Sequence, residues 1–260
     1  MISLLYRTLI LGALCFALTA ANAASSDELN DLAGRLQFNF YAADARSLQQ
    51  AIQEVEKLEL DGELGRLRDY QMAYGQWKLA ETLRAKDRSA ARRAADACIE
   101  AANKALEAVP KRGDAPRPDA VHAEVMAIQA GCFGLLSDMS LLPGGSRARK
   151  AIEAAMALQP SDPRVLLVNA EFAIAEAKSA AQKNSAVQSI AAAVAAFDAQ
   201  TPLPPDAPDW GYAEALTAMG DVQLQVGNRI AARNALERAL VLAPDFSRAR
   251  KLLTSDMTNR

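Results

Sequence analysis

Two cysteines are the side chains of this chain with the clearest capacity for covalent chemistry. Cys98 and Cys132 lie in separate segments with helical periodicity, whereas the third cysteine, Cys15, lies in an apolar N-terminal segment. A disulfide between Cys98 and Cys132 would join neighbouring helical hairpins and restrict the unfolded chain. The alternative is two buried free thiols that pack as small apolar residues. Both remain open, because the spacing does not tell how the two Cβ atoms point.

Combinations of residues typical of catalysis or metal binding are absent from the sequence. His122 is the only histidine, and no cysteine or second histidine lies at ligand spacing from it. Residues 143–146 (PGGS) superficially resemble a phosphate-binding loop, but their place between two predicted helices favours a turn and a helix N-cap. The short motifs of hydrolases, NTPases and dinucleotide-binding enzymes do not occur. We therefore expect no enzymatic activity and no bound metal or cofactor.

The charge balance argues against nucleic acid as a partner. The chain has 29 lysines and arginines against 31 aspartates and glutamates, a formal net charge of −2, far from the basic excess of nucleic-acid-binding domains. The densest basic segment, residues 84–93 (RAKDRSAARR), contains Asp87 and falls at a predicted helix junction. A solvated face explains this segment; contact with an acidic partner or an anionic lipid is the alternative.

Residues 1–23 have the order of features found in secretory signal peptides. Arg7 is followed by an apolar run over residues 8–20 and then by Ala21-Asn22-Ala23, an A-x-A cleavage pattern. The run is shorter than the roughly 20 apolar residues that a membrane-spanning helix needs. We expect cleavage after Ala23 and a periplasmic or secreted location, with an uncleaved anchor of the same topology as the alternative. No later segment is apolar enough to be a membrane helix.

The rest of the chain is predicted to be helical almost throughout. Apolar residues recur at intervals of three and four, and no segment shows the sustained two-residue alternation of strands. The segments 111–119 and 201–209 are rich in proline and charge and are expected to be connectors. Helices are predicted over residues 27–40, 44–58, 64–84, 89–108, 119–141, 146–158, 162–183, 185–199, 209–226, 229–242 and 245–255.

Residues 212–246 contain the clearest pair of helices. Gly220 falls inside the first helix, where a missing side chain permits close approach of the partner helix. Gly227 and Asn228 tolerate the left-handed conformation that ends a helix, and Pro244 ends the second one. The apolar stripe of the first helix consists of Leu216, Met219, Val222 and Val226. The stripe of the second consists of Ala232, Ala235, Leu236, Ala239, Leu240 and Ala243.

This pair of helices resembles a tetratricopeptide repeat. The spacing Leu216-x2-Met219-Gly220-x2-Gln223, then Ala232-x3-Leu236 and Pro244, follows the family pattern, with Gln223 as the clearest departure from it. Looser copies extend over residues 64–110, 119–160 and 162–202, each longer than the standard unit of about 34 residues. The resemblance implies an all-α fold, a right-handed α-solenoid of antiparallel hairpins with lengthened loops. Residues 24–260 would then form a single helical-repeat domain.

The aromatic residues and the last helix have structural interpretations. Tyr70, Tyr74 and Trp77 lie on one predicted helix and are expected to pack in the core rather than to bind a ligand. Trp210 is expected to cover one end of the last full hairpin. The helix predicted over residues 245–255 is rich in arginine and lysine, which is typical of a polar cap on a repeat array.

The resemblance also implies a binding function, because the first helices of such repeats line a concave groove that commonly binds peptides or helices. The lysines and asparagines of the family's carboxylate clamp have no counterpart in the projected groove. We expect an exported scaffold for protein–protein interaction, such as an envelope assembly or accessory factor, with an unidentified protein or peptide as partner. The alternative is a periplasmic binding module for a peptide or small molecule. A broad apolar patch would favour the scaffold. A deep groove with converging polar groups would favour the binding module. The groove candidates, carried over by position, are Met72, Gln76, Phe133, Ser137, Arg164, Leu167, Glu171, Glu214, Thr217, Asp221 and Leu224.

Overall fold

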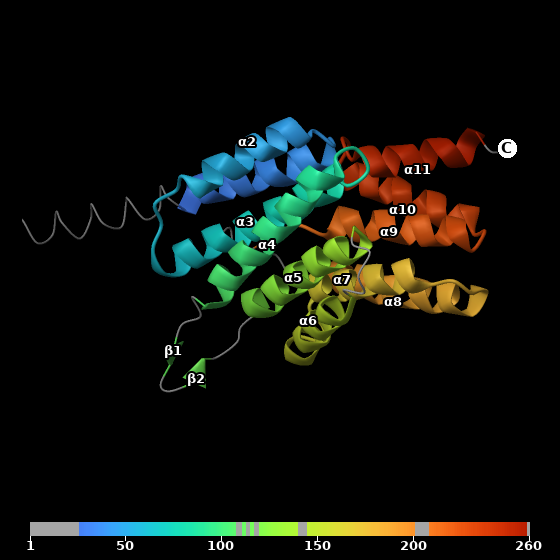
Figure 1. The fold of residues 1–260 in the computed structure, drawn as a ribbon. Helices are drawn as coiled ribbons and strands as arrows, with labels where there is room; N and C mark the ends of the chain where they lie inside the picture. The colour runs from blue at the N-terminus through green and yellow to red at the C-terminus, as the bar shows by residue number, and fades with distance from the viewer. Residues whose placement is uncertain are drawn as a thin grey trace, which may run out of the picture.

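The computed structural model describes residues 26–107, 111–112, 115–116, 120–139, 145–200 and 208–258. Over these residues the protein is all-α apart from two strands of two residues each (Figure 1). The predicted signal peptide, residues 1–23, and most of the connector predicted over residues 201–209 lie outside the described residues.

The described chain is mainly a series of helices. A first helix covers residues 26–41. The elements that follow are α2 (Ala45–Glu56), α3 (Gly62–Leu83), α4 (Arg88–Glu107), β1 (Lys111–Arg112), β2 (Ala115–Pro116), α5 (Ala120–Asp138), α6 (Gly145–Leu158), α7 (Pro163–Glu176), α8 (Ala180–Asp198), α9 (Tyr212–Gln225), α10 (Arg229–Leu242) and α11 (Ser247–Thr258).

The predicted division into helices is wrong at the junction between α7 and α8. A single helix was expected over residues 162–183, but α7 ends at Glu176 and the backbone of Ala177 is extended. The Ser179 hydroxyl accepts a hydrogen bond from the backbone N–H of Gln182, and the Gln182 side chain accepts one from the backbone N–H of Ser179. This capping box satisfies two free backbone donors and so begins a new helix at Ala180.

A small β-hairpin occupies part of the connector predicted over residues 111–119. Lys111 pairs with Pro116 and Arg112 with Ala115 in antiparallel register. These strands have no signal in the sequence, because two residues are too few to show an alternating pattern.

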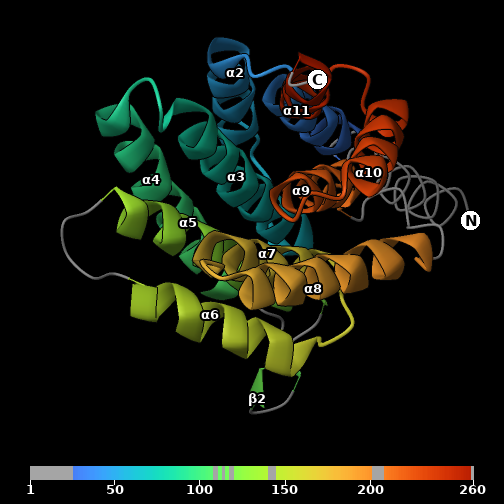
Figure 2. The same ribbon diagram turned by 90° about the vertical axis from the view of Figure 1, so that its right-hand side faces the viewer.

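Consecutive helices pack as adjacent pairs, with α3 against α4, α5 against α6, α7 against α8 and α9 against α10. The first helices of these pairs, α3, α5, α7 and α9, also pack against one another in chain order and are called the inner helices below. The chain curves so far that α11 lies next to the N-terminal helices (Figure 2). Phe246, just before α11, has its ring 4.4 Å from that of Tyr41 at the end of the first helix.

The pair α9 and α10 has the local features that the sequence predicts. A Cβ atom on Gly220 would lie only 2.5 Å from Cγ of Leu236, so the two helices approach too closely for any side chain there. Gly227 has a left-handed backbone, with φ +83°, and ends the turn after α9. The Asn228 side chain then accepts a hydrogen bond from the backbone N–H of Ala231 and caps α10.

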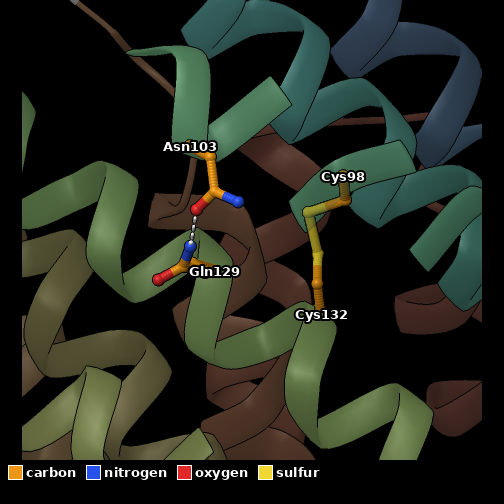
Figure 3. The surroundings of a disulfide bond; sticks show 4 residues. All are labelled: Cys98, Asn103, Gln129 and Cys132. Atoms are coloured by element: carbon orange, nitrogen blue, oxygen red, sulfur yellow. Dashed lines mark hydrogen bonds between the residues drawn. A yellow bond between two sulfur atoms is a disulfide. The ribbon is translucent and has the colours of Figure 1, made fainter. Parts of the chain in front are cut away.

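A disulfide joins the second helix of one pair to the first helix of the next. Cys98 on α4 and Cys132 on α5 are bonded with an S–S distance of 2.01 Å and a Cα–Cα distance of 6.4 Å (Figure 3). The Gln129 side chain donates a hydrogen bond of 2.8 Å to Oδ1 of Asn103 across the same seam. These contacts fix α5, one of the inner helices, against the preceding pair.

Candidate functional site

A buried lysine lies where the first helix, α3 and α9 meet. The Lys78 side chain is 1% exposed, its Nζ binds the carboxylate of Glu214, and the same atom lies 3.6 Å from Glu81. The ammonium also lies 3.6 Å from the ring centroid of Trp77 and 4.7 Å from that of Phe40. Burial alone lowers the pKa of Lys78, but the neighbouring carboxylates outweigh it and raise the pKa above its usual value. Lys78 is therefore charged and fully engaged inside the protein.

A second cluster of buried polar side chains joins α3, α5 and α7. The Tyr70 hydroxyl donates a 2.5 Å hydrogen bond to Glu124, and the indole N–H of Trp210 donates one of 2.5 Å to the Tyr70 oxygen. Arg164 lies 3.7 Å from Glu124 and donates a hydrogen bond to the carbonyl of Pro208. Burial and the adjacent Glu124 carboxylate raise the pKa of Tyr70 well above its usual value, so this hydroxyl stays protonated. As predicted, the aromatic side chains of α3 belong to the core.

These buried contacts close one part of the inner-helix surface, and four groove candidates lie inside the closed part. Arg164, Leu167, Glu214 and Thr217 are at most 5% exposed. The physical reason is the curvature of the chain, which brings α9 against α3 and leaves no open groove at this level. In this structure these four side chains are part of the interior.

The remaining part of the inner-helix surface opens into a cleft. Its volume is about 550 Å³, and α3, α5, α6, α7, α9 and α11 all contribute to its lining. Three groove candidates line it: Ser137, Glu171 and Asp221. The cleft walls are largely apolar and include Trp77, Leu135, Ile152, Val168 and Phe172.

The other groove candidates do not line the cleft. Met72, Gln76, Phe133 and Leu224 are half-buried elsewhere. Met72 packs against the core, and the ring of Phe133 lies 4.8 Å from the guanidinium of Arg147.

Most charged groups around the cleft are paired with one another. Arg248 of α11 lies 3.0 Å from Asp221 of α9 and 3.8 Å from Glu81 of α3, so it links three elements across the cleft. At the rim, exposed pairs join Arg149 to Glu176 at 2.6 Å and Arg84 to Asp138 at 3.8 Å.

Glu171, half-buried on α7, is different. No hydrogen bond or ion pair connects its carboxylate to another described residue, although it lines the cleft. Burial is the main cause that raises the pKa of Glu171 from the usual 4.5 to about 7. The attraction of Lys78 opposes this rise, and the repulsion of Glu81 and Glu214 adds to it. The cleft therefore holds a carboxylate that changes its charge near neutral pH.

Sequence reasoning missed several cleft residues. Arg248 was expected on a polar cap, whereas it reaches into the cleft because α11 returns to the N-terminal helices. Glu81 was not singled out, although its position three residues after Lys78 on a largely buried helix was a usable signal. Phe172 does not fall on a groove position of the repeat pattern, so the pattern carries no signal for it.

Two further properties concern the described part of the chain. It contains no group of three histidine, cysteine, aspartate or glutamate side chains arranged to hold a metal ion. None of its helices combines the length and the apolar character that crossing a membrane requires.

Comparison with known proteins gives no family assignment. No protein-family model matches the chain, and no curated protein matches its sequence significantly. Function is therefore inferred from the geometry of the cleft.

Proposed function

We propose that this chain is an exported, tetratricopeptide-like binding protein that recognises a protein partner by taking up a short peptide segment in the cleft. The observation that carries the proposal is the cleft itself, with apolar walls, several charged groups at its edge and a volume of about 550 Å³. Binding sites for small ligands and short segments commonly enclose about 300–1,000 Å³ and combine apolar walls with a few polar groups.

The size of the cleft distinguishes between kinds of bound segment. A helix with its side chains is about 10–12 Å across and needs a groove that is open along several inner helices. Here the contacts of Lys78 with Glu214 and of Trp210 with Tyr70 close the neighbouring surface. An extended segment of a few residues fits the remaining space better than a helix does.

The repeat family and the export remain part of the proposal. The pairing of consecutive helices and the close approach at Gly220 support tetratricopeptide-like units in a right-handed solenoid. The N-terminal sequence, with its A-x-A pattern at residues 21–23, supports export to the periplasm or beyond.

A periplasmic module for small molecules is the second candidate. The cleft favours it over a broad scaffold surface, because several helices line it and a compact ligand would contact more than one of them.

Site-specific photo-crosslinking tests the proposed function. A photo-crosslinking amino acid replaces Ala175, an exposed residue of α7 that lines the cleft, in cells that produce the full chain. The control position is Val241, which is 81% exposed on α10 and lies outside the cleft lining. We expect discrete crosslinked proteins from position 175 and not from position 241.

A variant that fills the cleft provides the second control. Ser137→Trp places a large side chain in the lining and should remove the crosslinks from position 175 while helical circular dichroism stays unchanged. Identical crosslinks from both positions, or crosslinks that persist with Ser137→Trp, would contradict binding in the cleft. Crosslinks to no protein would favour the small-molecule alternative.

A further inference from the structure

The cleft has an excess of negative charge. Its lining includes six carboxylates against three guanidinium groups. Arg84, Arg149 and Arg248 each pair with carboxylates of the same lining. No arginine of the cleft is therefore left to match the excess, and an acidic segment would be repelled.

Glu171 contributes to this negative excess, and its carboxylate is partly buried. The ionised groups that could compensate it are already engaged, since Lys78 binds Glu214 and Arg248 binds Asp221. Burying a carboxylate without a partner destabilises a protein. The charged groups on the surrounding elements are Lys78 and Glu81 of α3, Arg84 at the end of α3, Asp138 of α5, Arg149 and Glu153 of α6, Glu214 and Asp221 of α9, and Arg248 of α11.

The walls beside Glu171 suit a long side chain that is apolar along its stem. The half-buried ring of Phe172 offers aromatic surface, whereas Trp77 and Val168 line the cleft but are at most 3% exposed. An arginine side chain has an aliphatic stem, a guanidinium that stacks on aromatic rings, and a planar donor set that matches a carboxylate. A lysine shares the charge but holds its water more strongly and does not stack in the same way.

We propose that the segment taken up by the cleft carries an arginine, whose guanidinium pairs with Glu171 while its stem lies against the apolar wall. This inference rests on the proposed function and adds the chemistry of the bound segment to it. A neutral apolar segment would leave the Glu171 carboxylate covered and unpaired, which opposes binding.

Binding of two matched peptides tests the proposal. Both are short, dye-labelled and capped at each end, with leucines on either side of a central residue that is arginine in one and citrulline in the other. Citrulline keeps the shape of arginine and removes its charge. Fluorescence anisotropy with the full chain at about pH 8 should show tighter binding of the arginine peptide by about tenfold, the factor that corresponds to one charge-assisted pair.

Two variants locate the preference. Glu171→Gln keeps the shape of the side chain and should abolish the difference between the two peptides. Glu153→Gln removes an exposed carboxylate of the same lining and should leave the difference intact. The preference should also decline as the pH falls from about 8 to about 5.5, because the Glu171 carboxyl has a pKa of about 7 and becomes neutral. A lysine peptide of intermediate affinity would agree with the proposal.

Three results would overturn the arginine assignment. These are equal affinities of the two peptides for the unmodified protein, a preference that survives Glu171→Gln, and no binding of either peptide to the folded chain. None of them decides whether the cleft binds a protein segment, since the crosslinks from position 175 answer that question independently.

Discussion

Compared with the closed interior around Lys78, the cleft is built on the same inner helices but leaves its central carboxylate without a partner. In the closed part, Lys78 and Glu214 are each at most 5% exposed and satisfy one another. In the cleft, the half-buried Glu171 is part of the lining and has no hydrogen bond to a described residue. Both carboxyl groups have a raised pKa because of burial, yet only Glu214 receives a direct cation in return.

The difference separates two roles on one surface. Paired buried charges fix how the inner helices meet, and such pairs help to define a single arrangement even where they add little net stability. An unpaired carboxylate in a cleft destabilises the free protein and gains a partner only when a ligand arrives. We infer that the closed part maintains the fold and that the cleft binds.

The largest expected effect comes from breaking the closed part. Lys78→Ala removes the cation from Glu214 and leaves a buried carboxylate uncompensated, which should lower the free energy of unfolding by about 3–5 kcal/mol. Urea unfolding near neutral pH measures the change. Arg84→Ala is the matched control, because it breaks an exposed pair with Asp138 and should cost less than about 1 kcal/mol. Similar losses in both variants would remove the distinction between the two regions.

The next effect concerns the disulfide that holds α5, a helix shared by both regions. Replacing Cys98 and Cys132 together by alanine opens a loop with a sequence separation of 34. In the chain-entropy account this should lower the free energy of unfolding by roughly 3–4 kcal/mol. Denaturant unfolding of the oxidised protein, the reduced protein and the double variant measures it. The reduced protein should behave like the double variant; an oxidised protein that unfolds with the reduced one would contradict the prediction.

A smaller effect is expected at the contact between α5 and α3. A Cβ atom on Gly131 would lie 2.6 Å from the indole of Trp77, a ring that faces both Lys78 and the cleft. Gly131→Ala should therefore destabilise by about 1–3 kcal/mol through overpacking. Gly34→Ala is the control, because no atom lies within 4 Å of the added methyl group and the helix should gain up to about 1 kcal/mol. Thermal unfolding of both variants decides whether this contact is as tight as the geometry indicates.

The smallest effect has the opposite sign and belongs to the cleft. Because the pKa of Glu171 is raised in the folded protein, ionisation disfavours folding as the pH rises from about 4.5 to about 7, and the loss persists above that range. Glu171→Gln avoids the loss and should stabilise the protein by about 1 kcal/mol near pH 8, with allowance for partial solvation. Near pH 4 the two proteins should be equally stable. A variant that is less stable than the unmodified protein near pH 8 would show that Glu171 is compensated after all.

Much of the secondary structure could be predicted from local sequence signals. Gly227, Asn228 and Pro244 mark the ends of helices because their backbone preferences act over one or two residues. The break between α7 and α8 was missed, since Ser179 and Gln182 form a capping box inside a run that otherwise looks helical. The paired strands at residues 111–112 and 115–116 could not be predicted, because two residues are too few to show a periodic pattern.

The cleft could be predicted only in part, because it depends on contacts between distant segments. Lys78 and Glu214 are 136 residues apart, and no local pattern indicates that they meet. The family pattern selects Glu171, which lines the cleft, and by the same rule selects Thr217, which is fully buried. The rule describes an open groove, whereas the curvature of this chain closes part of it.

The most direct test of the account is a carboxyl NMR titration of Glu171, with its resonance assigned by comparison with Glu171→Gln. We expect a pKa of about 7 in the free protein, because the carboxylate is partly buried and unpaired. Addition of the arginine peptide should lower that pKa, since a bound guanidinium stabilises the charged form. A pKa near the usual 4.5 that does not change with either peptide would contradict both the unpaired carboxylate and its proposed ligand.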